Sequence, residues 1–154
     1  MQERHCNKNC CTPQSGQSSN LAYALYYQLE NISVAANDGI DFPLTAAESA
    51  GNFLSDGNQV QILKPGVYYV HYIVHLPAEE PLTTTFALQA NRQNVTGTER
   101  SVSQTATSSA VTVIAETMLN VCTPVSIRVV STAAAAITGE EGEVLSSLLI
   151  VQLA

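Results

Sequence analysis

The chain has 154 residues, of which 45% are hydrophobic, so it is long enough and apolar enough for one domain with a sizeable core. Only 12% of the residues are charged, the net charge is −7, and six Lys and Arg are scattered over the whole length. Such a distribution excludes the basic stripe with which proteins follow the phosphates of nucleic acids. A surface poor in charge and rich in Thr, Ser, Ala and Val is suited to burial against copies of the same chain.

Residues 1–20 are predicted to form a flexible connector. They contain no apolar side chain except Met1 and three cysteines, and Pro13, Gly16 and a Ser/Gln run are typical of a tether. About twenty extended residues reach roughly 60 Å, which is far enough to contact a neighbouring subunit. No apolar stretch follows the first charges, as a secretory signal would require, and no later apolar run has the length of a membrane-spanning helix. We therefore expect a protein that is made in the cytoplasm and does not insert into a membrane.

Residues 21–154 are predicted to form an all-β domain. Short segments rich in β-branched and aromatic residues alternate with Gly, Pro and Asn turns, and no segment has the 3.6-residue period of a helix. The expected strands are 21–29, 32–35, 39–45, 58–63, 66–76, 83–91, 98–104, 109–119, 124–132 and 146–153. Many short strands joined by such turns favour an antiparallel jelly-roll sandwich of about ten strands.

Three of these strands are apolar on both faces. Segment 124–132 alternates apolar and polar residues, which indicates one face toward the core and one toward water. In segments 21–29, 66–76 and 146–153 both faces are largely apolar. Because a sandwich has a single core, we predict that these three strands share a sheet whose outer face lies at a subunit interface. The residues expected at that interface are Tyr23, Tyr69, His71, Ile73, His75, Leu149 and Val151. The alternative is a generous core with a few exposed apolar residues.

Four stretches of the domain carry a resemblance to a known family. They are NQVQILKPGVYYVHYIVHL at 58–76, ALQANRQNV at 87–95, ETMLNVCTPVSIRVV at 116–130 and LSSLLIVQL at 145–153. In periodicity and turn chemistry they resemble strands of the trimeric jelly rolls, namely the globular head of complement component 1q and the tumour necrosis factor superfamily. The resemblance spans about residues 21–154, and it implies a homotrimer.

Within that group the charge-poor, Ala/Thr/Val-rich texture looks closest to a bacterial branch. Its members are the C-terminal domains of collagen-like exosporium glycoproteins and related subunits of spore-surface filaments. The Gly-X-Y collagen stalk of those proteins is absent from this sequence. The cysteine-bearing segment 1–20 takes its place, and it resembles the N-terminal connectors of endospore appendage fibres.

The four cysteines are the candidates for covalent linkage between subunits. Cys6, Cys10 and Cys11 lie in the connector, whereas Cys122 lies in a turn of the domain. Adjacent cysteines such as Cys10 and Cys11 rarely bond to each other, because the resulting ring is strained, so we expect both to pair outward. Disulfides among connectors and to Cys122 would join stacked trimers. The alternatives are a reduced connector with a buried Cys122, and a zinc site formed by His5 with the three connector cysteines.

No catalytic residue or resident cofactor is predicted. His71 and His75 share a strand face but lie roughly 13 Å apart, too far to chelate one ion within a chain, and Glu79 does not complete a cupin-type metal triad. A ring of three His71 side chains around a trimer axis is an alternative metal site. The carboxylates of the loop 139–143 could hold calcium weakly, although a solvated turn is the better explanation.

These observations predict a structural subunit and no enzyme. The expected assembly is a homotrimer that stacks head to tail into a disulfide-linked fibre on the extracellular surface of a bacterial endospore. Its expected partner is itself, together with an anchoring or tip protein, and neither nucleic acid nor membrane is expected. The alternative is a trimeric head, tethered to a surface, that binds a receptor or a glycan and does not polymerise.

Overall fold

The computed structural model describes residues 21–154. This part of the chain contains thirteen strands and no helix, so the all-β prediction is confirmed. The strands are β1 (Tyr23–Gln28), β2 (Ile32–Val34), β3 (Leu44–Glu48), β4 (Phe53–Ser55), β5 (Val60–Ile62), β6 (Gly66–Leu76), β7 (Leu82–Ala90), β8 (Gln93–Asn94), β9 (Arg100–Gln104), β10 (Val111–Val121), β11 (Val125–Ser131), β12 (Ala135–Ile137) and β13 (Ser146–Gln152). Since the described residues include no helix, none of them forms a helical membrane span.

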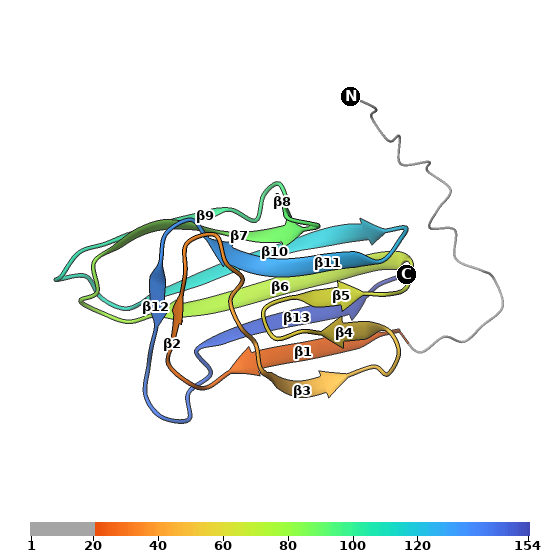
Figure 1. Ribbon diagram of the computed structural model, residues 1–154, viewed down its shortest axis with the longest axis horizontal. Coiled ribbons are helices and arrows are strands. Elements are labelled where there is room, and N and C mark those ends of the chain that lie inside the picture. Colours follow the sequence, from red (N-terminus) through yellow and green to blue (C-terminus); the bar gives the residue numbers. More distant parts are fainter. Residues whose placement is uncertain (1–20) are drawn as a thin grey trace.

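Two antiparallel sheets make up the jelly roll. A five-stranded sheet has the order β10-β6-β13-β1-β3. A six-stranded sheet has the order β4-β5-β11-β7-β8, and β9 pairs with β7 on the same side as β8. A small third sheet pairs β12 with β2. Figure 1 shows the strands of the two large sheets running along the long axis of the domain, with β2 and β12 lying across that direction.

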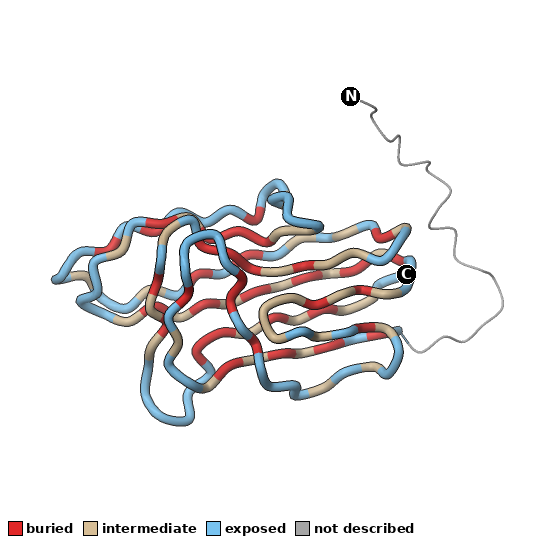
Figure 2. The backbone as a smooth tube through the Cα atoms, in the orientation of Figure 1, coloured by how far each residue is buried: buried red, intermediate tan, exposed pale blue. Residues whose placement is uncertain are grey.

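The core lies between the two large sheets. Strand β6 alternates between buried and half-buried residues along its whole length, so every second side chain points inward (Figure 2). Tyr26, Tyr68 and Tyr72 contribute the largest fully buried side chains of the five-stranded sheet, and Phe86 and Ile127 are buried on the facing sheet. Aromatic and branched side chains of this size bury the apolar area that stabilises a sandwich.

The buried tyrosines keep hydrogen-bond partners for their hydroxyls. Tyr72 donates to the carbonyl of Thr98 at 2.8 Å, Tyr68 donates to the carbonyl of Lys64 at 2.9 Å, and Tyr26 donates to the Glu48 carboxylate. Burial raises the pKa of Tyr26, Tyr68 and Tyr72 above the ordinary value of a phenol. Because each of these three hydroxyls has an acceptor, the core contains the tyrosines without leaving a hydrogen-bond donor unpaired.

One predicted strand, 39–45, is wrong. The chain at Gly39 makes an isolated bridge with Val130, and strand β3 begins only after Pro43, which has no N–H group to donate to a ladder. The N–H groups of Ile40 and Phe42 donate instead to carbonyls of the six-stranded sheet and of its β4–β5 turn. Both side chains are buried, so the apolar pattern marks a loop that closes the core.

The sequence also predicted no strand at β4, β8 or β12. These strands have two or three residues each, which is too short for an alternation of apolar and polar residues to be visible. The 66–76 strand, in contrast, has the predicted bounds, because a Pro-Gly turn precedes it and its alternation continues over eleven residues.

Candidate functional site

The outer face of the five-stranded sheet is the candidate functional site. Strands β6, β13 and β1 are consecutive neighbours in this sheet, as the sequence predicted from their doubly apolar pattern. Their inner side chains pack in the core, and the alternating side chains of the opposite face are half-buried or exposed. The sheet therefore presents a broad surface on which apolar side chains from different strands lie side by side.

Cross-strand register places the outer residues in rows, because paired residues point to the same side of a sheet. From β10 across to β1, the first three rows are Met118, Tyr69, Val151 and Tyr23; then Glu116, His71, Leu149 and Leu25; then Ile114, Ile73, Ser147 and Tyr27. His75 continues the face beside Thr112, and Leu44 of β3 extends the third row. We call this set the outer apolar face.

All seven residues predicted at the interface lie on the outer apolar face. The sequence did not single out its contributions from β10 and β3, among them Met118, Ile114 and Leu44. Alternation in β10 places Met118 and Ile114 on the same side as Glu116, and the charged residue obscured the apolar pattern. Pairing with β6 could be known only from the structure.

Several apolar side chains of the outer apolar face are exposed to solvent. Met118 is 67% exposed, Tyr23 51% and Ile114 49%, and these residues come from different strands. Soluble monomers rarely expose contiguous apolar patches larger than a few hundred Å². A surface of this kind is the usual mark of a protein–protein contact.

A polar cluster of Tyr69, His71 and Glu116 lies within the outer apolar face. The Tyr69 hydroxyl donates to Oε2 of Glu116 at 2.5 Å, and this hydrogen bond, followed by burial, raises the pKa of Tyr69. The His71 ring stacks on the Tyr69 ring with centroids 6.3 Å apart and an interplanar angle of 13°. His71 is also the cross-strand partner of Glu116. A contact that buried this face would therefore enclose a carboxylate that already has a donor and an imidazole beside it.

His71 and His75 contact different residues in the structure. His75 lies near the end of β6, where its Nδ1 is 2.9 Å from the Thr112 hydroxyl, whereas His71 lies at the middle of the strand and stacks on Tyr69. Within residues 21–154 no three His, Cys, Asp or Glu side chains are close enough to share an ion.

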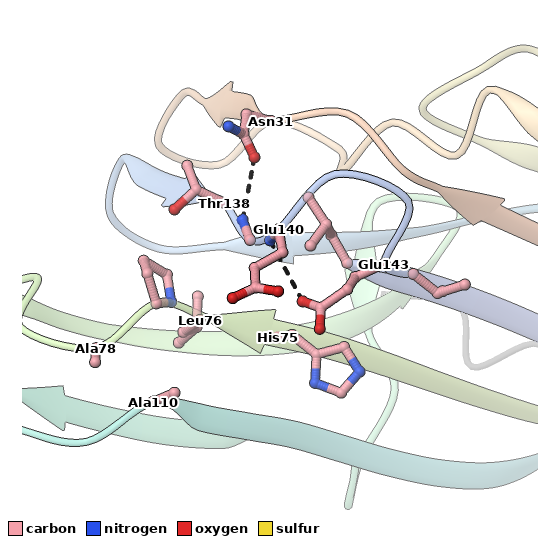
Figure 3. Close-up of a pocket in the computed structure, with 12 residues that line it drawn as sticks. Asn31, His75, Leu76, Ala78, Ala110, Thr138, Glu140 and Glu143 are labelled. Carbon is pink, nitrogen blue, oxygen red and sulfur yellow. Dashed lines mark hydrogen bonds between the residues drawn. The ribbon is translucent and has the colours of Figure 1, made fainter.

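The acidic loop 139–143 lines a cavity of about 840 Å³ at the end of β6. Figure 3 shows the carboxylates of Glu140 and Glu143 over this cavity, with the His75 ring below them. The N–H of Glu140 donates to Oε2 of Glu143 at 3.3 Å, and the N–H of Gly139 donates to Oδ1 of Asn31 at 3.1 Å. The loop is thus held by one hydrogen bond within it and one to Asn31, and within residues 21–154 its carboxylates are not part of a group of three or more His, Cys, Asp or Glu that could hold an ion.

Cys122 lies in the turn between β10 and β11, where it is half-buried. It lines a cavity of about 220 Å³ together with Asn91, Leu119 and Val125. Its sulfur takes part in a disulfide. Cys6, Cys10 and Cys11, like His5, lie outside the described residues, so the predicted pairing of Cys122 with them and the zinc alternative stay predictions.

No protein-family model matches this sequence, and no curated protein is similar to it. Solved structures share its fold at low sequence identity. A crystal structure of murine APRIL matches with a TM-score of 0.64 and 11% identity, covering 87% of this chain and 100% of that one. The Eiger tumour necrosis factor of S. frugiperda matches with a TM-score of 0.62 and 16% identity, covering 87% and 93%. The globular domain of zebrafish complement 1qA matches with a TM-score of 0.61 and 12% identity, covering 86% and 98%. The chain therefore has the jelly-roll fold of tumour necrosis factors and complement 1q heads.

Proposed function

We propose that this protein is a structural subunit that assembles with copies of itself through the outer apolar face. The observation that carries the proposal is the continuity of that face across all five strands of one sheet. A stable interface commonly buries about 800 Å² on each partner.

The proposed assembly is a homotrimer. The chain has the fold of jelly rolls whose resemblance to this sequence implies three-fold assembly, and the proposed contact uses the sheet that contains β6, β13 and β1. In a three-fold arrangement the outer apolar faces of the three copies contact one another around the symmetry axis. The pair of Tyr69 and Glu116 would then be enclosed as a hydrogen-bonded unit, which reduces the cost of burying the carboxylate.

A charge on the outer apolar face tests this contact directly. Ile114→Glu places a carboxylate at an exposed aliphatic position of the face, and Leu54→Glu makes a comparable change at a similarly exposed leucine of β4, in the other sheet. We expect Ile114→Glu to weaken association by about 2–4 kcal/mol, because each copy would bury an unpaired charge. Sedimentation velocity should then show a folded monomer for Ile114→Glu and an unchanged oligomer for Leu54→Glu. Equal behaviour of the two variants would contradict the proposed interface.

We propose further that trimers stack head to tail into a fibre on the surface of a bacterial endospore. In this proposal residues 1–20 of one trimer reach the next, and Cys6, Cys10 and Cys11 form disulfides among connectors and with Cys122. The support is that Cys122 lies half-buried in the turn after β10 and takes part in a disulfide. A contact that repeats in one direction without closing generates a filament.

Electron microscopy and gels test the fibre separately from the trimer. The full chain is expected to form thin filaments that run as a ladder on a non-reducing gel and as one band near 16.4 kDa after reduction. Cys122→Ser should shorten the ladder and leave the trimer intact. Discrete particles that run as one band under both conditions would contradict the fibre. They would favour instead a trimeric surface head that binds a ligand.

A further inference from the structure

A polar cleft on the six-stranded sheet is independent of the outer apolar face. Gln59, Asn91, Arg92, Ser126 and Arg128 line a cavity of about 270 Å³. These residues come from the β5 end, the β7–β8 turn and strand β11. The lining residues are two arginines, one glutamine, one asparagine and one serine, and none of them is acidic or apolar.

The two guanidiniums of this cleft stand out because the chain has few cations. The described part contains four, and the other two are Lys64 and Arg100. The guanidinium of Arg100 is occupied within the fold, since it donates to the backbone carbonyls of Gly97, Glu99 and Ile114. Within residues 21–154 neither Arg92 nor Arg128 has a carboxylate in hydrogen-bonding contact. Two positive groups thus face one cleft without an internal counter-charge.

Hydrogen bonds fix the floor of the cleft. The Oδ1 of Asn91 accepts from the N–H of Ser126 at 3.0 Å, and the Ser126 hydroxyl donates to Oε1 of Gln59 at 3.0 Å. The Nε of Arg128 donates to Oε1 of Gln89 at 3.0 Å, which leaves the terminal nitrogens of this guanidinium to other acceptors. The nearest acid along this network is Asp56, at 3.4 Å from Nε2 of Gln59, and it lines a different cavity.

Arg92 occupies an unusual backbone position for an arginine. Asn91 and Arg92 form the two-residue turn of the β7–β8 hairpin, with φ of 49° and 67°, and Ala90 pairs with Gln93 on either side. Turns with two residues in the left-handed region favour glycine at the second position, because a Cβ is strained there. Strain of this kind is common where a side chain serves a binding site. The position of Arg92 is thus an observation independent of the charge of the cleft.

We propose that this cleft binds an anionic saccharide unit, with its carboxylate held by Arg92 and Arg128. Paired guanidiniums suit a planar carboxylate, since each can donate two parallel hydrogen bonds. The amides of Gln59 and Asn91 and the hydroxyl of Ser126 are suited to the hydroxyl groups of a sugar ring. No apolar side chain lines the cleft, which disfavours an acidic peptide whose neighbouring side chains need apolar pockets. All five residues belong to one chain, so the site does not require the proposed assembly.

Saturation-transfer NMR on the full chain tests this site, because the method tolerates large assemblies. The probes are glucuronate and, as its neutral analogue, glucose; inorganic sulfate, which has no protons to observe, is added as a competitor that reports on the bare anion through the loss of the glucuronate signal. We expect saturable binding of glucuronate, with weaker binding of both comparison molecules. Arg92→Gly should weaken glucuronate binding about tenfold or more, and Arg92→Gly with Arg128→Gln should abolish it.

Lys64→Ala is the matched control, since it removes one positive charge from an exposed turn outside the cleft. It should leave binding unchanged. Arg92→Gly should also raise the thermal midpoint slightly, which would show that its loss of binding is not a loss of folding. The proposal would be overturned by absent glucuronate binding, by equal binding of glucose, or by an equal loss in Lys64→Ala. Sulfate binding as tightly as glucuronate would overturn the saccharide assignment.

Discussion

The two large sheets of this jelly roll are both antiparallel, but the side chains on their outer faces differ in polarity. On the five-stranded sheet, outer positions hold Tyr23, Ile114 and Met118, all about half exposed or more. On the six-stranded sheet, cross-strand pairs on the outer face are polar, among them Thr85 with Ser101 and Arg128 with Gln89. The inner faces of both sheets are apolar and buried. The difference therefore lies outside the core, and it is the basis for proposing that the five-stranded sheet contacts other subunits whereas the six-stranded sheet faces solvent.

Two adjacent leucines of β13 offer the strongest test of this comparison within one strand. Leu148 points into the core and is 1% exposed, whereas Leu149 points to the outer apolar face. In an Ile114→Glu background, which we expect to be monomeric, Leu148→Ala should lower the free energy of unfolding by about 2–5 kcal/mol. Leu149→Ala in the same background should lower it by less than about 1 kcal/mol. Urea unfolding measures both values.

Leu148 and Leu149 also test assembly, in the protein that keeps Ile114 unsubstituted. Leu149→Ala should raise the dissociation constant of the oligomer, because it removes apolar area from the contact. If it destabilised the monomer as much as Leu148→Ala does, the outer position of Leu149 would be wrong. If it left the oligomer unaffected, the row that contains His71 and Leu25 would not be part of the interface.

Alkaline pH should lower the stability of the folded domain through its buried tyrosines. The pKa of Tyr26 is raised above the unfolded value of 10.0 by burial and by its hydrogen bond to Glu48. The folded protein therefore prefers the neutral phenol, and the corresponding stability is complete below pH 10 and declines as the pH rises above it. A thermal midpoint measured between neutral pH and high pH should fall at the alkaline end. Tyr26→Phe should flatten that fall.

A hydrogen bond on the polar outer face should matter least. The Thr85 hydroxyl lies 3.1 Å from the Ser101 hydroxyl in an exposed cross-strand pair. Thr85→Val keeps the β-branched shape and removes this contact, so we expect a change in unfolding free energy below about 0.5 kcal/mol. Sedimentation of the variant should remain that of the unsubstituted oligomer. A loss of assembly would show that the six-stranded sheet also contacts other subunits.

The sequence predicted that three strands of the five-stranded sheet are apolar on both faces and share one sheet, and the strand order confirms the shared sheet. Long strands such as 66–76 contain enough residues for both faces to be judged, and their shared sheet followed from the need for a second apolar cover. Alternation failed where the chain is locally irregular. Ile40 and Phe42 have the spacing of a strand but belong to a loop whose N–H groups bond to distant carbonyls.

The polar cleft could not be predicted, because its residues are far apart in sequence. Gln59, Asn91 and Ser126 meet only once β5, β7 and β11 are neighbours in the order that the structure gives. The sequence did indicate a short Asn-containing turn at 87–95, without distinguishing the left-handed backbone of Arg92. Sites built by pairing of distant strands need the register as well as the motif.

The mass of the reduced protein in solution tests the central claim most directly. With disulfides reduced, native mass spectrometry of the full chain should give a species of three times the 16.4 kDa chain mass. Ile114→Glu should convert that species to the single-chain mass, and Leu54→Glu should not. A reduced, folded protein that has only the single-chain mass at micromolar concentration would contradict assembly through the outer apolar face.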